Sequence, residues 1–159
     1  MAQITVISVG TLKEGYLKEA VAEYKKRLSQ YARVDVIELN EERISDEENA
    51  LEIKKALERE SEKILPRIPK GSYKIALCVE GKEYSSEELA KIVDSAVSGT
   101  GKLALIIGSS HGLSDSVKRE CDLRLSFSRL TFPHQLMRAI LFEALYRSFT
   151  IIHGKKYHK

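Results

Sequence analysis

The sequence predicts an α/β fold in which a mostly parallel sheet carries helices on both faces. Short apolar and β-branched segments alternate with segments of helical periodicity along the whole chain, which is typical of strand–helix–strand units. One of these segments, residues 103–107, is apolar at all five positions, as expected for a central parallel strand buried on both faces. With 159 residues the chain has the length of one domain, which we expect to span residues 1–159.

The first half of the chain contains three predicted strands, at residues 3–9, 34–39 and 73–79. Between the first two strands, apolar and aromatic side chains recur at helical spacing and predict a helix. These side chains are Tyr16, Leu17, Ala20, Val21, Tyr24, Leu28 and Tyr31. The polar residues 40–48 then predict a mobile loop. A second helix follows, with its apolar positions at Leu51, Ala56, Leu57, Ile64 and Leu65.

The second half opens with a capping box, because Ser85 is followed three residues later by Glu88. This pair predicts the start of a third helix, which leads into the strand at residues 103–107. The remaining pattern predicts a short helix near 114–120, a strand at 122–126, a loop at 127–132 and a long helix beginning near Pro133.

Parallel sheets bind ligands beyond the carboxyl ends of their strands, so the loops after Val79, Ile107 and Ser126 are candidate sites. The loop after the first strand has neither the GxGxxG pattern nor a P-loop, because Tyr16 stands where a P-loop has lysine. The usual loops for dinucleotides and nucleoside triphosphates are therefore excluded. This places the site in the second half of the chain.

Two of these candidate loops are compatible with ordinary turns. Gly108 and Gly112 flank the loop after residues 103–107, where glycine permits a close backbone approach or a positive φ. Residues 80–82 after the third strand also fit a simple turn. The glycines by themselves predict no more than a strand-to-helix connection.

The segment 127–138 carries a stronger signal. It surrounds a predicted helix start with two phenylalanines, two hydroxyl side chains and two arginines, and the free backbone N–H groups of a helix start favour an anion. His134 and Arg138 are four residues apart and so share one face of that helix. We therefore expect a binding site here.

The final helix is apolar around most of its circumference, so it lies either in the core or against a partner subunit. Glu143 and Arg147 are spaced for an i,i+4 ion pair. This pair is equally compatible with a minor surface interaction and with a part in the site.

The charge is unevenly distributed along the chain. Residues 1–117 hold 17 lysines and arginines against 20 acidic residues, whereas residues 118–159 hold nine against three. A basic carboxyl-terminal part favours an anionic partner such as RNA or DNA, although a solvated basic tail gives the same count. In this tail, lysines can contact phosphates and Tyr157 can stack on a base.

Several classes of protein are disfavoured. The chain has no apolar run of transmembrane length, and its first residues lack the features of a signal peptide. The two cysteines, Cys78 and Cys121, lie far apart and suit a reducing compartment. From the lack of a signal peptide and the cysteine usage we expect a cytoplasmic protein. No histidine lies in a metal-binding motif, so we expect no metal.

Four segments together resemble the RlmH family of bacterial ribosomal large-subunit pseudouridine N3-methyltransferases, which belong to the SPOUT class. They are residues 105–113, 125–138, 143–147 and 157–159, and the opening strand and first helix also match. The resemblance therefore covers essentially the whole chain. The tract from Phe127 to Arg138 together with the terminal Tyr157-His158 is its most specific part.

The resemblance implies a SPOUT fold with a carboxyl-terminal trefoil knot, a homodimer with its site at the subunit interface, and S-adenosylmethionine as cofactor. Carried over by position, the implied cofactor contacts are Leu77, Gly108, Phe127, Ser128, Arg129, Leu130, Thr131 and Phe132. One position departs from the family, which commonly has a second glycine where this chain has Ser109. We expect Ser109 to narrow the glycine turn.

The implied reaction moves a methyl group to N3 of a pseudouridine in large-subunit rRNA, and N3 must lose a proton. We expect His134 or His158 to accept that proton, the latter across the dimer, while Arg138 stabilises negative charge. Phosphates of the RNA are expected to contact Arg129, Lys155, Lys156 and Lys159.

Two other functions remain open from the sequence. The chain could be a non-catalytic RNA- or ribosome-binding factor that retains the fold, in which case it would not bind S-adenosylmethionine. It could also methylate a small molecule, but the basic carboxyl-terminal part disfavours this alternative.

Overall fold

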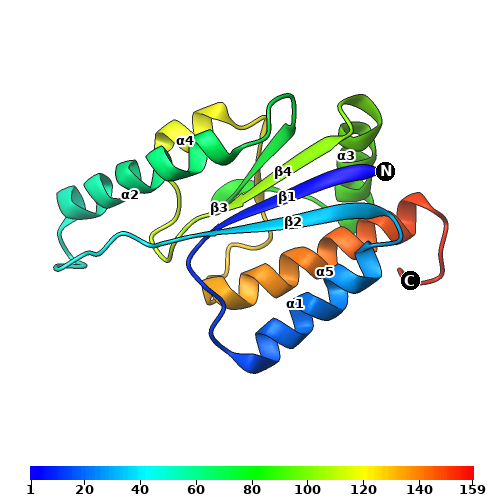
Figure 1. Ribbon diagram of the computed structural model, residues 1–159, viewed down its shortest axis with the longest axis horizontal. Helices are drawn as coiled ribbons and strands as arrows, with labels where there is room; N and C mark the ends of the chain where they lie inside the picture. Colours follow the sequence, from blue (N-terminus) through cyan, green and yellow to red (C-terminus); the bar gives the residue numbers. More distant parts are fainter.

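Five parallel strands form one sheet at the centre of the molecule (Figure 1). The computed structural model describes residues 1–159 and gives the strand order β2-β1-β4-β3-β5, with every neighbouring pair parallel. The strands are β1 (Ala2–Val9), β2 (Ala32–Leu39), β3 (Tyr73–Glu83), β4 (Lys102–Ile107) and β5 (Leu123–Ser126). The predicted parallel α/β sheet is confirmed.

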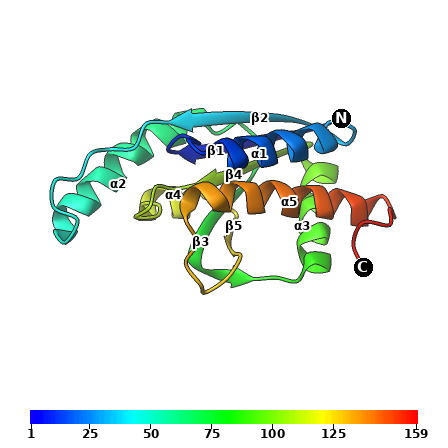
Figure 2. The same cartoon turned by 90° about the horizontal axis from the view of Figure 1, so that it is seen from below.

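Helices cover both faces of this sheet, as predicted (Figures 1 and 2). The helices are α1 (Gly15–Leu28), α2 (Ala50–Ile64), the 3-10 turn η1 (Leu65–Arg67), α3 (Ser86–Gly99), α4 (Asp115–Glu120) and α5 (His134–Ile152). On one face α5 packs between α1 and α3, and on the other face α2 packs against α4. None of the helices combines the length and apolar content that a membrane span requires.

The two faces of the sheet bury unequal cores. Leu103, Leu105 and Ile107 of β4 point into a cluster of 22 buried residues beneath α1, α3 and α5. Ile106 points the other way, into a cluster of eight residues beneath α2 and α4. β4 is therefore buried on both faces, as its continuous apolar sequence predicted. The nearly all-round apolar α5 lies in the larger core, where its Phe142 is fully buried.

The third strand differs from its prediction, because it continues to Glu83 instead of ending at Val79. β3 pairs with β5 through Leu77, leaves the ladder for four residues and pairs again from Lys82. The predicted turn at residues 80–82 is thus part of a bulge within the strand. Gly81 permits this path, because a Cβ there would lie 2.8 Å from the backbone of Arg124 in β5.

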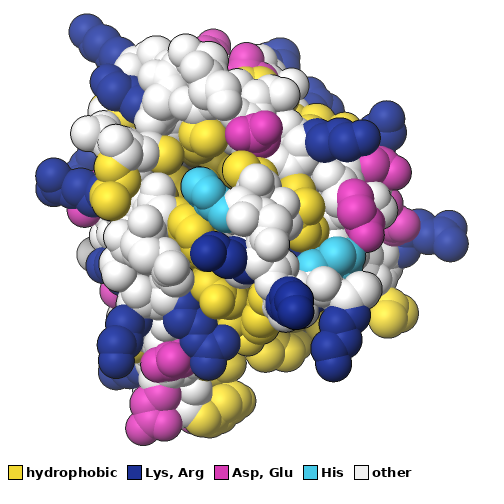
Figure 3. Space-filling model, turned by 90° about the vertical axis from the view of Figure 1, so that its right-hand side faces the viewer, with side chains coloured by type: hydrophobic (Ala, Val, Ile, Leu, Met, Phe, Trp, Pro, Cys, Tyr) yellow, Lys and Arg dark blue, Asp and Glu magenta, His cyan; other side chains and the backbone are white.

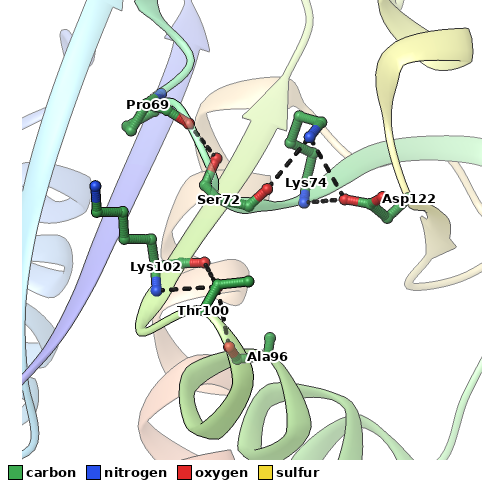
Figure 4. A network of polar contacts seen from close by, with 7 residues as sticks. All are labelled: Pro69, Ser72, Lys74, Ala96, Thr100, Lys102 and Asp122. Carbon is green, nitrogen blue, oxygen red and sulfur yellow. Dashed lines mark hydrogen bonds and ion pairs between the residues drawn. The ribbon is translucent and has the colours of Figure 1, made fainter.

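The amino ends of the strands are closed by short polar contacts (Figure 4). The Lys74 backbone N–H donates to the Asp122 carboxylate at 2.8 Å, which joins the start of β3 to the residue before β5. The Thr100 hydroxyl lies 3.1 Å from the Ala96 carbonyl and 2.8 Å from the Lys102 carbonyl, between the end of α3 and β4. These bonds satisfy the backbone at this end of the sheet.

The predicted loop between β2 and α2 is irregular, and hydrogen bonds attach it to two glutamates of α2. The Glu42 backbone N–H donates to Glu60 at 2.8 Å, and the Ser45 backbone N–H donates to Glu52 at 2.5 Å. The trefoil knot implied by the resemblance concerns the threading of the chain from β5 into α5, and it stays a prediction.

A buried arginine joins the start of α5 to the first two strands. Arg138 is 2% exposed, and its guanidinium donates to the Ser8 hydroxyl at 2.8 Å, to the Gly10 carbonyl at 3.0 Å and to the Glu38 carboxylate. Burial raises the pKa of Glu38, but the hydrogen bonds from Arg138 and from the Leu12 backbone N–H bring this pKa below its usual value. The network thereby fixes α5 against the carboxyl ends of β1 and β2.

Replacing this arginine should destabilise the protein. We expect Arg138→Met to lower the free energy of unfolding by about 3 kcal/mol, because three hydrogen bonds are lost and their partners lie at the edge of the core. Urea unfolding followed by circular dichroism measures the difference. Arg27→Met is the matched control, since Arg27 is also a helical arginine that bonds a glutamate but lies on the surface, and it should leave stability nearly unchanged. Equal losses in the two variants would contradict a structural role for the Arg138 network.

Candidate functional site

A cavity of about 710 Å³ opens at the carboxyl ends of β3 and β4. This volume lies in the range of pockets for small molecules and cofactors. Its walls come from the bulge of β3, the glycine turn after β4, the loop after β5 and the start of α5. Figure 2 shows the loop between β5 and α5 running beside the extended end of β3. Segments far apart in the sequence therefore meet around one cavity.

The glycine turn is shaped by a backbone crossing. A Cβ on Gly108 would lie 2.2 Å from the carbonyl oxygen of Gly112, which leaves no room for a side chain. Gly112 itself has a φ of +90°, a conformation that glycine adopts without strain. Both explanations for glycine in this loop therefore apply: Gly108 allows a close backbone approach, and Gly112 adopts a positive φ. The turn lines the cavity with both glycines and with the residues between them.

Ser109 is buried within this turn and lies near a buried carboxylate of α2. Burial raises the pKa of Glu60, while the Glu42 backbone N–H and the Ser109 hydroxyl oppose that increase. Ser109 therefore lies toward Glu60 of α2, on the far side of the sheet from α5, while the Glu60 Oε1 atom is buried without a hydrogen-bond partner. The expected narrowing of the turn by Ser109 stays a prediction.

The β3 bulge supplies residues that the sequence analysis missed. Cys78, Val79 and Glu80 leave the ladder and line the cavity, and Glu80 forms an ion pair with Lys118 of α4. The hydrogen bond from Lys118 lowers the pKa of Glu80, and burial raises the pKa of the Cys78 thiol. The available signal was Gly81, because a glycine within a strand pattern indicates a bulge.

His134 lies in the wall of the cavity at the first turn of α5. Its Nε2 atom is buried without a hydrogen-bond partner and faces Gly10, where a Cβ would lie only 2.5 Å from this nitrogen. Burial lowers the pKa of His134, and the nearby positive charge of Arg138 lowers it further, whereas Glu41 opposes the shift. The ring is therefore neutral at neutral pH. Of the two ring nitrogens, Nε2 is thus the enclosed one.

The structure brings most of the predicted cofactor residues together. Those that line the cavity are Leu77, Gly108, Phe127, Ser128, Leu130, Thr131 and Phe132. Arg129 is exposed and lies outside the lining, although both of its neighbours belong to it. Arg138 also lies outside, since its guanidinium points to β1 and β2. The geometry therefore gives Arg138 a positioning role, and the predicted charge-stabilising role receives no support from its contacts.

The carboxyl-terminal tail lies elsewhere on the same chain. His158 contacts Arg147 at 3.1 Å and Glu87 at 2.7 Å, and Tyr157 packs under the guanidinium of Arg147 at 4.7 Å. Arg147 and Glu143 line a separate, smaller cavity of about 230 Å³ beside α3. The predicted tail residues Lys155, Lys156, Tyr157, His158 and Lys159 are therefore absent from the larger cavity.

The position of His134 makes its titration measurable. Its pKa in the folded protein should lie below the value of about 6.5 for a free histidine, because burial and Arg138 both disfavour the charged ring. The unfolded chain then binds a proton more readily than the folded one. Stability linked to His134 is therefore full above pH ~6.5 and falls as pH decreases from there to the folded pKa.

Two measurements test this prediction. A proton NMR titration should give His134 a midpoint below the value of about 6.5 for a free histidine. His134→Gln should reduce the loss of unfolding free energy between pH 7.5 and 5.5. A His134 midpoint at or above about 6.5 would contradict the assignment of a buried, neutral ring.

The comparisons with known proteins agree along the whole chain. The model of a protein family described as "Predicted SPOUT methyltransferase" matches residues 2–158. Proteins named ribosomal RNA large subunit methyltransferase H are 49% identical in Caldicellulosiruptor bescii, 48% in Bacillus pumilus and 49% in Clostridioides difficile. Each alignment covers 98% of this chain and 99% of the relative.

A solved structure is similar in fold. A methylase family protein from Haemophilus influenzae Rd KW20 superimposes with a TM-score of 0.51 at 16% identity, covering 97% of this chain and 67% of the other. This likeness concerns the fold alone. The match over residues 2–158 and the relatives near 50% identity show that the chain belongs to the SPOUT methyltransferase family.

Proposed function

We propose that this protein transfers a methyl group from S-adenosylmethionine to N3 of a pseudouridine in large-subunit rRNA. The observation that carries the proposal is the cavity at the glycine turn, in a chain about half identical to relatives named for this class of activity. Because the proposed substrate belongs to the ribosome, we propose a cytoplasmic location. The alternatives, a non-catalytic ribosome-binding factor and a small-molecule methyltransferase, are separated from this proposal by the experiments below.

The cavity fits the proposed cofactor. Gly108 and Gly112 line the cavity, and the contact between them leaves no space for a side chain at position 108, so the turn keeps a compact shape beside the ligand. Leu77 and Ile107 at the strand ends and Phe127 and Phe132 in the loop after β5 offer apolar surface for a flat ring. When bound, the cofactor supplies a methyl group on a positively charged sulfur. The protein then has to position the acceptor nitrogen in line with it.

His134 is the proposed proton acceptor within one chain. It lines the cavity, and burial lowers its pKa, so the ring is neutral at neutral pH. A neutral imidazole can take the proton that N3 loses. Arg138 acts through position, because its bonds to Ser8 and Gly10 hold the first turn of α5 and therefore the imidazole in place.

The tail is proposed to work in the cavity of a second copy of the chain. His158 contacts Arg147, and the 13 residues of α5 between Arg147 and His134 correspond to about 20 Å at 1.5 Å per residue. The tail therefore does not reach the large cavity of its own chain. A homodimer with α5 near its interface would bring His158 and the tail lysines to that cavity, and Leu136, exposed by 36%, offers apolar surface on this helix.

The glycine turn gives a direct test of the cofactor site. We expect Gly108→Ala to weaken S-adenosylmethionine binding at least tenfold by calorimetry, because the new methyl group would displace Gly112 and reshape the turn. Gly99→Ala is the matched control, since its Cβ would meet nothing within 4 Å, and binding should be unchanged. Wild-type protein that binds no S-adenosylmethionine would instead favour the non-catalytic factor.

The substrate is tested by mapping rRNA methylation by mass spectrometry in cells lacking this protein. We expect one methylated pseudouridine of the large subunit to lose its methyl group and to regain it with the wild-type gene. His134→Ala should restore it poorly even though the variant still binds the cofactor. Unchanged rRNA methylation would defeat the substrate assignment and favour a small-molecule acceptor. Full restoration by both His134→Ala and His158→Ala would remove these two histidines from the proton-accepting role.

A further inference from the structure

Two segments distant in sequence carry positive charge without any acidic residue. Residues 25–34, at the end of α1 and the start of β2, contain four lysines and arginines and no aspartate or glutamate. Residues 144–159, at the end of α5 and in the tail, also contain four and no acidic residue. Such runs are unusual in a chain that is 31% charged with nearly balanced signs.

Aromatic contacts hold these two segments together at one end of the molecule. Tyr31 stacks on His153 with ring centroids 4.7 Å apart and an interplanar angle of 16°, and it also stacks on Phe149 at 5.7 Å. The Arg27 guanidinium lies 5.7 Å from the centre of the Tyr146 ring. The end of α1 is therefore packed against the end of α5 as part of the same surface.

Five lysines on this surface are exposed and form no ion pair. The arginines have acidic neighbours, since Arg27 pairs with Glu23 and Arg147 with Glu143. The unpaired side chains are Lys25, Lys26, Lys155, Lys156 and Lys159, and we call them the basic end face. Figure 3 views this end of the molecule, where lysine and arginine side chains lie near two histidines, with acidic side chains among them.

Helix stabilisation explains only part of this arrangement. Lys25 and Lys26 lie in the last turn of α1, where a cation interacts favourably with the helix dipole. That local effect needs no contribution from the tail, yet the tail adds three more unpaired lysines beside it. A cluster of unpaired ammonium groups around an exposed, stacked His153 matches the chemistry of a phosphate backbone with accessible bases.

We propose that Lys25 and Lys26 of α1 form an RNA-contacting surface together with the tail, and that this basic end face binds the phosphates of large-subunit rRNA that flank the methylated nucleotide. The inference rests on the proposed function and extends it to a helix that takes no part in the cofactor cavity. Phosphate contacts of this kind fix the orientation of a protein on its RNA and carry no base specificity.

The test compares two double variants with the same loss of charge. Lys25→Gln with Lys26→Gln removes the α1 part of the basic end face, whereas Lys54→Gln with Lys55→Gln removes two adjacent exposed lysines of α2 on the other face of the sheet. Binding to purified large ribosomal subunits is measured between 50 and 200 mM salt (about the range over which phosphate contacts are screened). Calorimetry with S-adenosylmethionine verifies that both variants retain the cavity.

We expect the α1 variant to bind roughly tenfold more weakly and to lower the slope of log affinity against log salt by about 1.4–1.8, since each lost phosphate contact removes 0.7–0.9. The α2 variant should bind like the wild type. Equal affinities and slopes in the two variants, with intact wild-type binding, would overturn the basic end face alone. A wild-type protein without salt-dependent binding to the large subunit would overturn the proposed function as well.

Discussion

The attachment of α5 to the carboxyl ends of β1 and β2 is the constraint on which the site depends. Arg138 reaches Ser8, Gly10 and Glu38 from within the core, so its guanidinium fixes both the height and the rotation of the first turns of α5. His134 lies one turn earlier on the same helix and is pressed against Gly10. A side chain at position 10 would collide with the imidazole, so the glycine and the arginine together determine where His134 sits. The cavity wall follows from that placement.

Close backbone approaches shape the rest of the cavity. Gly81 lies against the backbone of Arg124 and Leu125, and Gly108 lies against Gly112. The bulge of β3 therefore meets β5 without an intervening side chain, and the glycine turn closes on itself in the same way. Backbone N–H and C=O groups at such positions can hydrogen-bond a ligand, which side-chain motifs in the sequence do not reveal. The amino ends of the strands contrast with this edge, because bonds such as Lys74 to Asp122 close them.

The sequence predicted the features that depend on local periodicity. The alternation of strands and helices, the doubly buried strand at residues 103–107 and the loop leading into α5 all follow from residue spacing within short segments. The contact between Glu38 and Arg138 joins residues 100 positions apart, and no local pattern distinguishes a buried arginine from an exposed one. The bulge of β3 was missed for a related reason: residues 80–82 have the composition of a turn, and only pairing with β5 makes them part of a strand.

The length of α5 explains why we propose that one chain alone is an incomplete unit for the reaction. α5 has 19 residues, so its two ends are separated by about 28 Å. The cavity with His134 adjoins its first turn, whereas His158 and the basic end face adjoin its last. Methyl transfer to RNA requires the nucleotide and its flanking phosphates to be held at the same time. In the proposed homodimer, the phosphate contacts and the cofactor cavity around one nucleotide would come from different chains. Loss of the tail in one subunit would then impair catalysis in the other, which makes α5 the element that couples the two sites.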